Sequence, residues 1–554
     1  MKRTRLLAAP VVALAVLAAA CNANSTSNSK SQPKAAKGGT LYILTDQPTV
    51  ELDPAKSQNL GTTTLHLFQR GLTTWKEAPG QSPTVVGDLA TDTGTPSDNG
   101  KVWTYHLKTG LKYSNGKPIV AQDVKYGLER SFDPSLAGGL NYHKTLLVGG
   151  GTYKGPFSGK QLASIETPNA TTIIFHLNKS FGDWPWIASM PAFSPVPKAS
   201  DTDPVNYGKH PVSSGPYSVQ SLKQGKELIG VRNKYWSKDD IRSGQASKIV
   251  LDMGLSDSTV NNRLITDQGN DKDAISYVSL QAPLLPKVQG NPSVKSRLST
   301  GSGALTYLAM NVKRKALSNL KVRQAIEYAV DKKSVQVAAG GPTIGGDIAS
   351  TLITPGLNGY QKYNAYQAPD GGDVKKAKSL LASAGYAKGL TLTMLVDTSV
   401  DTTVSESEAI QAALKRAGIT VKFRQLDSDA WTADATGNKS DYDLTVSSWL
   451  ADYPSAAGAI QPLFGADQIG NQGYNISRYT TGPVDAAINA AIGETDQSKA
   501  ESDWAALDKK IMGDAPVVPL LYAKNAFLRG SQVANFYLPP YPPYPNLLVL
   551  GLSK

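Results

Sequence analysis

Residues 390–423 read LTLTMLVDTSVDTTVSESEAIQAALKRAGITVKF, and this stretch decides the fold class. Apolar side chains alternate over Leu390–Met394 and again over Ile419–Phe423, as on half-buried strands. Between them, Ser405–Glu408 fits a capping box that opens an amphipathic helix, and Gly418 can end that helix in left-handed geometry. A strand, a helix and a strand in this order predict a right-handed β-α-β unit in a mostly parallel sheet.

Other segments extend this mixture of strands and helices. Residues 103–107 alternate as a strand, residues 114–117 have turn chemistry, and residues 373–384 predict a helix that stops at Gly385. No self-similarity occurs at periods of 20–50 residues. With 554 residues, 40% of them apolar, the chain is too long for one core and too apolar for global disorder. We expect an α/β protein of several lobes.

The first twenty residues are typical of a secretory signal. Three basic residues precede an uncharged run over residues 6–20, which is too short to span a bilayer comfortably. Cys21 follows three alanines and resembles the modified cysteine of the bacterial lipobox. A lipid on Cys21 accounts best for a lone cysteine in an exported chain, and ordinary secretory cleavage beside an incidental cysteine is the alternative.

The segment that follows is predicted to be a tether. Residues 21–37 are polar and rich in Ser and Asn, and about sixteen flexible residues reach ~20–24 Å. We therefore expect a lipid-anchored protein on the extracytoplasmic face of the cell membrane. The formal charge of +12 includes six basic and no acidic residues in residues 1–37, so the body carries only +6. No aromatic and basic stripe accompanies this charge, so we expect no nucleic-acid partner.

The sequence predicts neither a metal site nor a cofactor. The five histidines are scattered, and no phosphate-binding loop or GxSxG nucleophile elbow occurs. Ser97-Asp98-Asn99, Lys108-Thr109-Gly110 and Ser27-Asn28-Ser29-Lys30 match three short elements of penicillin-recognising serine enzymes. Only eight residues lie between the first two, and the third lies in the tether, where no rigid base is expected beside it. An enzyme of that kind is a remote alternative, and we expect a protein that is not an enzyme.

A specific resemblance covers the body of the chain. Residues 104–130 (TYHLKTGLKYSNGKPIVAQDVKYGLER) closely resemble the extracytoplasmic solute-binding protein family 5 of bacterial ABC importers, which bind dipeptides, oligopeptides or nickel. Further blocks follow the order of that family: residues 38–41, 52–54, 213–217, 322–332 and 515–520.

The resemblance implies a three-lobed clamp of the type II periplasmic-binding-protein class (cluster C), with mixed sheets and two strands that cross between lobes. Lobe I is expected to comprise residues 38–73, 200–303 and 528–554, lobe II residues 74–199, and lobe III residues 304–527. Such a clamp closes on its ligand as a monomer and is recognised by the permease subunits of an importer.

The segment Trp449-Leu450-Ala451-Asp452-Tyr453 is the candidate site. It follows a predicted strand at residues 443–449, and ligands in such sheets lie beyond the carboxyl ends of strands. In peptide-binding proteins that this chain resembles, the aspartate of this motif pairs with the peptide α-ammonium, which assigns Asp452 to that role. The alternative for Asp452 is a turn residue before Tyr453-Pro454.

The other candidate ligand-binding residues are less specific. Trp449 is expected to form a pocket wall or to pack in the core, and Tyr453 and Ser448 lie beside it in the sequence. Tyr307, near a predicted crossing strand, and Tyr142 complete the set. Within the same fold, an oligosaccharide or a metal chelate is an alternative ligand, and a surface adhesin or chaperone that reuses the fold is a further alternative.

Overall fold

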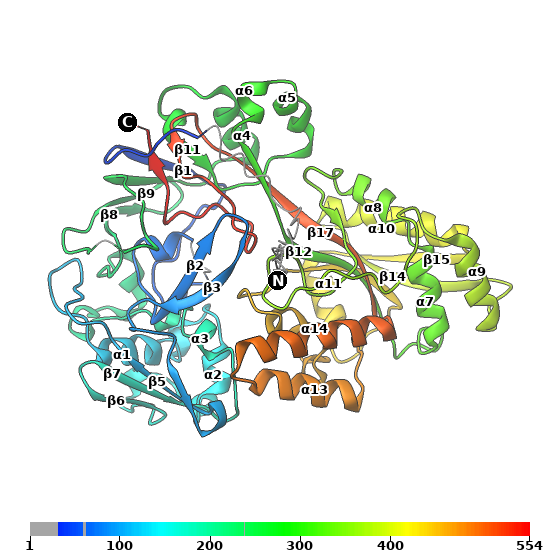
Figure 1. Cartoon of the computed structure of the whole chain (residues 1–554), viewed down its shortest axis with the longest axis horizontal. Helices are drawn as coiled ribbons and strands as arrows, with labels where there is room; N and C mark the ends of the chain where they lie inside the picture. The colour runs from blue at the N-terminus through cyan, green and yellow to red at the C-terminus, as the bar shows by residue number, and fades with distance from the viewer. Residues whose placement is uncertain (1–31, 59–62, 238, 554) are drawn as a thin grey trace, which may run out of the picture.

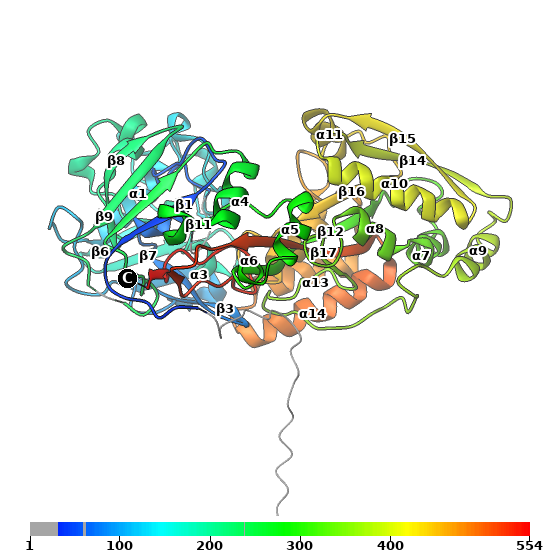
Figure 2. The ribbon, with the colours of Figure 1, turned by 90° about the horizontal axis from the view of Figure 1, so that it is seen from above.

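The computed structural model describes residues 32–58, 63–237 and 239–553. Figure 1 shows two halves joined by two long strands, β12 (Leu298–Met310) and β17 (Val517–Leu528), and Figure 2 shows this connection from above. The two strands are antiparallel, and register shifts interrupt their pairing between Ser302 and Leu305. Lobe I, lobe II and lobe III denote below the residue ranges predicted from the sequence.

A five-stranded sheet in the order β11-β1-β10-β9-β8 lies in the residues of lobe I. β1 pairs in parallel with β10 and β11, and its buried Leu41 and Ile43 face a core that Phe68 shares. The strands are β1 (Thr40–Leu44), β8 (Tyr217–Lys223), β9 (Glu227–Arg232), β10 (Lys248–Asp252) and β11 (Ala274–Ser276).

An antiparallel sheet in the order β4-β5-β7-β6 and a hairpin lie in the residues of lobe II or at its border. The predicted strand at residues 103–107 is β5, and its buried Trp103 and Tyr105 pack with Phe175 of β7. The strands are β2 (Thr73–Ala78), β3 (Gln81–Gly87), β4 (Thr95–Ser97), β5 (Val102–His106), β6 (Ile165–Asn169) and β7 (Thr172–His176).

The second half is built on a six-stranded mixed sheet in the order β13-β17-β12-β16-β14-β15. Its strands besides β12 and β17 are β13 (Asp347–Ile348), β14 (Leu390–Asp397), β15 (Ile419–Leu426) and β16 (Leu444–Trp449). Two short strands of the C-terminal segment, β18 (Val533–Ala534) and β19 (Gly551–Leu552), pair antiparallel with each other within the residues of lobe I. The parallel and antiparallel pairings confirm the prediction of mixed α/β sheets.

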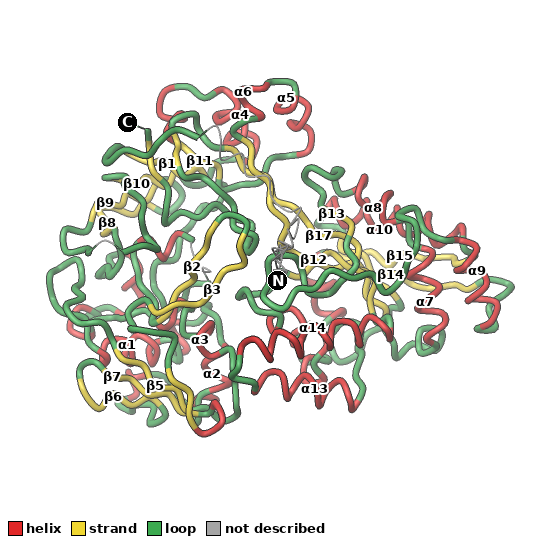
Figure 3. The backbone as a smooth tube through the Cα atoms, viewed as in Figure 1, coloured by secondary structure: helices red, strands yellow, loops and turns green. Residues whose placement is uncertain are grey.

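Long helices gather around the sheet of the second half, whereas short helices and loops fill much of the first (Figure 3). The helices of the first half are α1 (Ala121–Arg130), α2 (Tyr142–Leu146), α3 (Trp184–Ile187), α4 (Asp257–Thr266), α5 (Leu285–Gln289) and α6 (Pro292–Lys295). Those of the second half are α7 (Leu320–Ala329), α8 (Lys332–Ala338), α9 (Val374–Ser383), α10 (Asp401–Arg416), α11 (Ser428–Ala435), α12 (Ala457–Phe464), α13 (Gly482–Gly493) and α14 (Gln497–Asp514). Among the described residues, none of these helices is long and apolar enough to cross a membrane.

The predicted β-α-β unit is β14, α10 and β15, and its two strands are parallel neighbours. The capping box at Ser405–Glu408 is wrong, because α10 begins four residues earlier at Asp401. Ser405 lies inside the helix, where its hydroxyl donates a hydrogen bond to the Asp401 carbonyl at 3.1 Å. Gly418 adopts a φ of +90° after the helix, as predicted for a residue that ends it in left-handed geometry.

The chain joins the packed body before Gly38. The Phe536 amide donates a hydrogen bond to the Gln32 side chain at 2.7 Å, and the Ala36 amide donates to the Leu552 carbonyl at 2.6 Å. The part of the tether at residues 32–37 is therefore held by the C-terminal segment. The predicted signal, Cys21 and Ser27–Lys30 lie outside the described residues.

Two buried ion networks tie lobe II to lobe I. Arg130 of α1 donates to Asp53 at 2.7 Å and to Asp201 at 2.7 Å, and all three side chains are fully buried. Asp88 likewise accepts hydrogen bonds from Arg70 and Arg242, each at 2.6 Å. Breaking a buried pair leaves an uncompensated charge, so these networks hold the two lobes together as one body.

Candidate functional site

The candidate segment leaves the sheet of lobe III at the end of β16. This strand pairs antiparallel with β12, which places Trp449 opposite Leu305 and Ser447 opposite Tyr307. The loop that follows carries Asp452 and Ser455 to residues of lobe II. The segment therefore lies where the two halves of the molecule meet.

Asp452 is a partly buried carboxylate whose hydrogen-bond partner comes from the other half. The hydroxyl of Tyr142, on α2, donates to Asp452 Oδ2 at 2.6 Å. Burial raises the pKa of Asp452, and the hydrogen bond from Tyr142 offsets part of that rise. Within the part of the chain that the structure describes, no lysine, arginine or histidine forms an ion pair with this carboxylate.

Aromatic side chains surround this carboxylate. The rings of Tyr142 and Tyr453 meet edge to face at 5.9 Å between centroids. Trp449 is tilted against Tyr474 at 4.9 Å between centroids, and its indole nitrogen donates to the Gly458 carbonyl at 2.8 Å. The hydroxyl of Tyr541 donates to the carbonyl of Ala451, which precedes Asp452. An acidic group with aromatic rings near it suits a ligand with a cationic end and apolar parts.

The structure brings four of the six candidate residues together: Tyr142, Trp449, Asp452 and Tyr453. Tyr307 lies on β12 on the same face of the sheet as Trp449, but only 3% of it is exposed. Ser448 is exposed and points to the opposite face, because successive side chains on a strand alternate.

Two further aromatic residues of this site have no signal in the sequence. Tyr474, 48% exposed, lies in an irregular loop after α12 and has no periodicity to mark it. Tyr541 is fully buried and lies 90 residues from the carbonyl that it contacts. Neither lies in a motif of the resemblance, so only the folded chain reveals them.

Further contacts join the halves around Asp452. The Ser455 hydroxyl donates to Asp183 of lobe II at 2.6 Å, and burial raises the pKa of Asp183 to about 6. The Gly182 amide donates to the Ile492 carbonyl of α13 at 2.7 Å. Asn358 donates through its side chain to the Pro83 carbonyl at 3.0 Å. Lobe II and lobe III are therefore in direct contact in this conformation.

The elements of a serine enzyme are not assembled in the described residues. Ser97 is exposed at the end of β4, and Lys108 donates through Nζ to the Gly87 carbonyl at 3.1 Å. Ser27–Lys30 lies outside the described residues. Across residues 32–58, 63–237 and 239–553, no group of three histidine, cysteine or acidic side chains is placed to hold a metal ion.

Comparison with known proteins identifies relatives along almost the whole chain. The family model described as bacterial extracellular solute-binding proteins, family 5, matches residues 84–471. The glutathione-binding protein GsiB of Shigella dysenteriae is 25% identical over 458 residues, which are 80% of this chain and 82% of that protein.

Solved structures agree with the fold. Clavulanic acid biosynthesis oligopeptide binding protein 2 has a TM-score of 0.84 and 29% identity, with 94% of this chain and 97% of that chain covered. The periplasmic murein tripeptide-binding protein MppA, in its unliganded open form, has a TM-score of 0.77 and 20% identity, with 94% and 99% covered. These likenesses confirm the type II binding-protein fold and the predicted family resemblance.

Proposed function

The chain belongs to the bacterial extracellular solute-binding proteins of family 5, and we propose that it is a receptor that captures peptides and delivers them to an ABC importer. The observation that carries this proposal is Asp452, a partly buried carboxylate at the meeting point of two lobes that forms no ion pair with any described residue. A peptide α-ammonium supplies the missing positive charge. Proteins similar to this chain bind glutathione or oligopeptides by name, which supports a peptide ligand.

Closure of the two halves is the proposed mode of capture. β12 and β17 join the halves, and the register shift near Ser302 is a point at which paired strands bend readily. The contacts from Tyr142, Gly182 and Ser455 form when lobe III approaches lobe II, so they represent the closed state. MppA, which shares the fold, also exists in an unliganded open form. The permease recognises the closed form, whose population the ligand raises.

We further propose that a lipid on Cys21 holds the protein, as a monomer, at the extracytoplasmic face of the membrane. The sequence before Cys21 fits a lipoprotein signal, and residues 22–31 are long enough to separate the body from the bilayer surface. Two acyl chains, at ~0.8 kcal/mol per buried CH₂, give a stable anchor.

The first experiment identifies the natural ligand. The protein is purified without denaturant and then unfolded, and the released molecules are analysed by mass spectrometry. We expect peptides. A released oligosaccharide or metal chelate would replace the peptide proposal and leave the assignment to the family intact.

The second experiment tests Asp452 with the recovered peptide. Removing one partner of a buried charge pair costs ~2–5 kcal/mol, so Asp452→Asn should weaken affinity by about 30-fold to several-thousand-fold in calorimetry. Asp429→Asn, at an exposed position in α11 of the same lobe, should bind like the parent protein. Unchanged affinity in Asp452→Asn would show that the ligand carries no cationic group at this carboxylate.

A further inference from the structure

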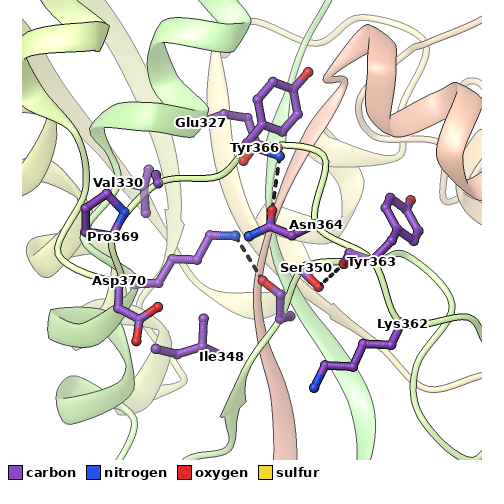
Figure 4. A pocket seen from close by; sticks show the side chains of 13 residues that line it. Glu327, Val330, Ile348, Ser350, Lys362, Tyr363, Asn364, Tyr366, Pro369 and Asp370 are labelled. Carbon is purple, nitrogen blue, oxygen red and sulfur yellow. Dashed lines mark hydrogen bonds between the residues drawn. The ribbon is translucent and has the colours of Figure 1, made fainter.

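Lobe III contains a cavity that Asp452 does not line. It has a volume of about 390 Å³, within the range of roughly 300–1,000 Å³ of small-molecule pockets. Figure 4 shows its walls, formed by Glu327 near the end of α7, Ile348 and Ser350 at and after β13, and the loop that carries Tyr363 and Pro369. β13 and β16 are three positions apart in the sheet, and neither Asp452 nor its hydrogen-bond partner Tyr142 lines this cavity.

A buried carboxyl oxygen on the wall of this cavity has no hydrogen-bond donor among the described residues. Glu327 is only 2% exposed, and its Oε1 atom accepts no hydrogen bond from residues 32–58, 63–237 or 239–553. Burial raises the pKa of Glu327 and lowers the pKa of Lys332, and the attraction between the two groups opposes both shifts. A buried polar atom without a partner carries a desolvation cost, which a donor in the cavity would remove.

A cationic group lies on the same cavity wall. Lys332, at the start of α8, donates through Nζ to the Ala349 carbonyl at 2.9 Å, and its other two N–H groups make no hydrogen bond within the part of the chain that the structure describes. Glu327 and Lys332 interact electrostatically but do not form an ion pair within 4 Å. Asp370 and Lys362 also line the cavity, and their side chains are acidic and basic, respectively. The cavity thus offers a hydrogen-bond acceptor and a hydrogen-bond donor on two consecutive helices.

We propose that this cavity binds a free α-amino acid, whose ammonium group contacts Glu327 and whose carboxylate contacts Lys332. The apolar side chains of Val330, Ile348 and Pro369 line the remaining space and suit an aliphatic side chain. The site is separate from the proposed peptide site and does not depend on it.

The test uses L-leucine as the probe and the methyl group of Ile348 as the reporter. In the intact protein labelled at isoleucine methyl groups, the resonance of Ile348 is assigned from its loss in Ile348→Val. L-leucine should shift it, whereas N-acetyl-L-leucine, which lacks the ammonium, and L-leucinamide, which lacks the carboxylate, should not. Absence of a shift at the solubility limit of L-leucine would overturn the proposal, because the cavity then holds only solvent.

Four variants separate this site from its surroundings. Glu327→Gln and Lys332→Met should each weaken L-leucine binding about tenfold to a hundredfold, as expected for charged hydrogen bonds. Lys333→Met, beside Lys332 but hydrogen-bonded to Gln336, should bind like the parent protein. Asp452→Asn should also retain binding. Loss of binding in Asp452→Asn, or full binding in Glu327→Gln, would place the ligand elsewhere and overturn the proposal.

Discussion

The hydroxyl of Tyr142 donates the hydrogen bond that Asp452 accepts across the two halves. Tyr142→Phe removes that donor and leaves the ring contact with Tyr453 in place. Because a hydrogen bond to a charged group contributes ~1.5–3 kcal/mol, we expect peptide affinity to fall about tenfold to a hundredfold at neutral pH. Calorimetry with the recovered peptide measures this change.

The same substitution should alter the pH dependence of binding. Burial raises the pKa of Asp452 and the Tyr142 hydroxyl lowers it, so the pKa rises further in Tyr142→Phe. Only the carboxylate form pairs with an ammonium, and the affinity of the variant should therefore fall at a higher pH than that of the parent protein. Parallel pH profiles for the two proteins would contradict this role for Tyr142.

The predictability of the site differs from residue to residue. Asp452 and Trp449 could be predicted because both belong to one contiguous motif that resembles a known family. Tyr142 was also predicted, but its contact with Asp452 spans 310 residues and no sequence pattern indicates it. Tyr474 and Tyr541 were missed because an irregular loop and a distant C-terminal segment position them.

At the scale of elements, Arg130 holds α1 against lobe I. Arg130→Met leaves Asp53 and Asp201 buried without their cation, which should reduce the free energy of unfolding by about 3–5 kcal/mol. Urea unfolding followed by tryptophan fluorescence measures the loss. Arg263→Met is the matched control, because Arg263 also binds two aspartates but is 30% exposed, and we expect a loss of at most ~1 kcal/mol there. Equal losses in both variants would contradict a special role for the buried network.

Gly182 lets lobe II approach α13. A Cβ atom at this position would lie 1.7 Å from the Glu494 carbonyl oxygen, and the Gly182 backbone does not have a positive φ that an alanine would strain. Gly182→Ala should therefore act as a wedge that holds the halves apart and weakens peptide affinity at least tenfold. X-ray scattering of the peptide-bound protein should show a larger radius of gyration in the variant.

Gly151→Ala is the control for this wedge, because nothing lies within 4 Å of its Cβ position and it belongs to the same lobe. We expect its affinity and radius of gyration to match those of the parent protein. If Gly182→Ala also matched the parent protein, the contact between Gly182 and α13 would not belong to the closed state.

The elements themselves were largely predictable where local patterns were strong. Alternation placed β14 and β15, and Asp373 accepts a hydrogen bond from the Lys376 amide at 2.8 Å as the cap of α9. The start of α10 was not predictable, because Ser405 satisfies a capping pattern by chance and its hydroxyl binds within the helix instead. A local capping pattern therefore does not show at which residue a helix begins in the folded protein.

For the molecule as a whole, acidity should control closure in the absence of ligand. Asp183 meets Ser455 across the two halves, and burial with the nearby charge of Glu501 raises its pKa from 3.8 to about 6. When the halves separate, the carboxyl regains water and its pKa falls back toward the ordinary value. A carboxyl group with the higher pKa in the closed state favours that state when it is protonated.

This difference fixes the direction and the pH range of the effect. The free energy of closure is most favourable below about pH 4. It becomes less favourable by up to ~3 kcal/mol as the pH rises through 6, since each pKa unit corresponds to ~1.4 kcal/mol. The radius of gyration of the ligand-free protein should therefore be smaller at pH 5 than at pH 7.5. Asp183→Asn should reduce the difference, and the double variant with Asp452→Asn should abolish it, because burial raises the pKa of Asp452 in the same direction.

Peptide binding should show the opposite dependence on pH. Protonation of Asp452 removes the charge that attracts an ammonium group, so the affinity for a peptide should fall at low pH. In the ligand-free protein, low pH should instead favour the closed state. Scattering without ligand and calorimetry with ligand, measured on the same samples from pH 5 to pH 7.5, separate the two effects. If the radius of gyration stayed constant over this range, the contact between Asp183 and Ser455 would not form on closure. If it changed equally in Asp183→Asn, a different group would control the transition.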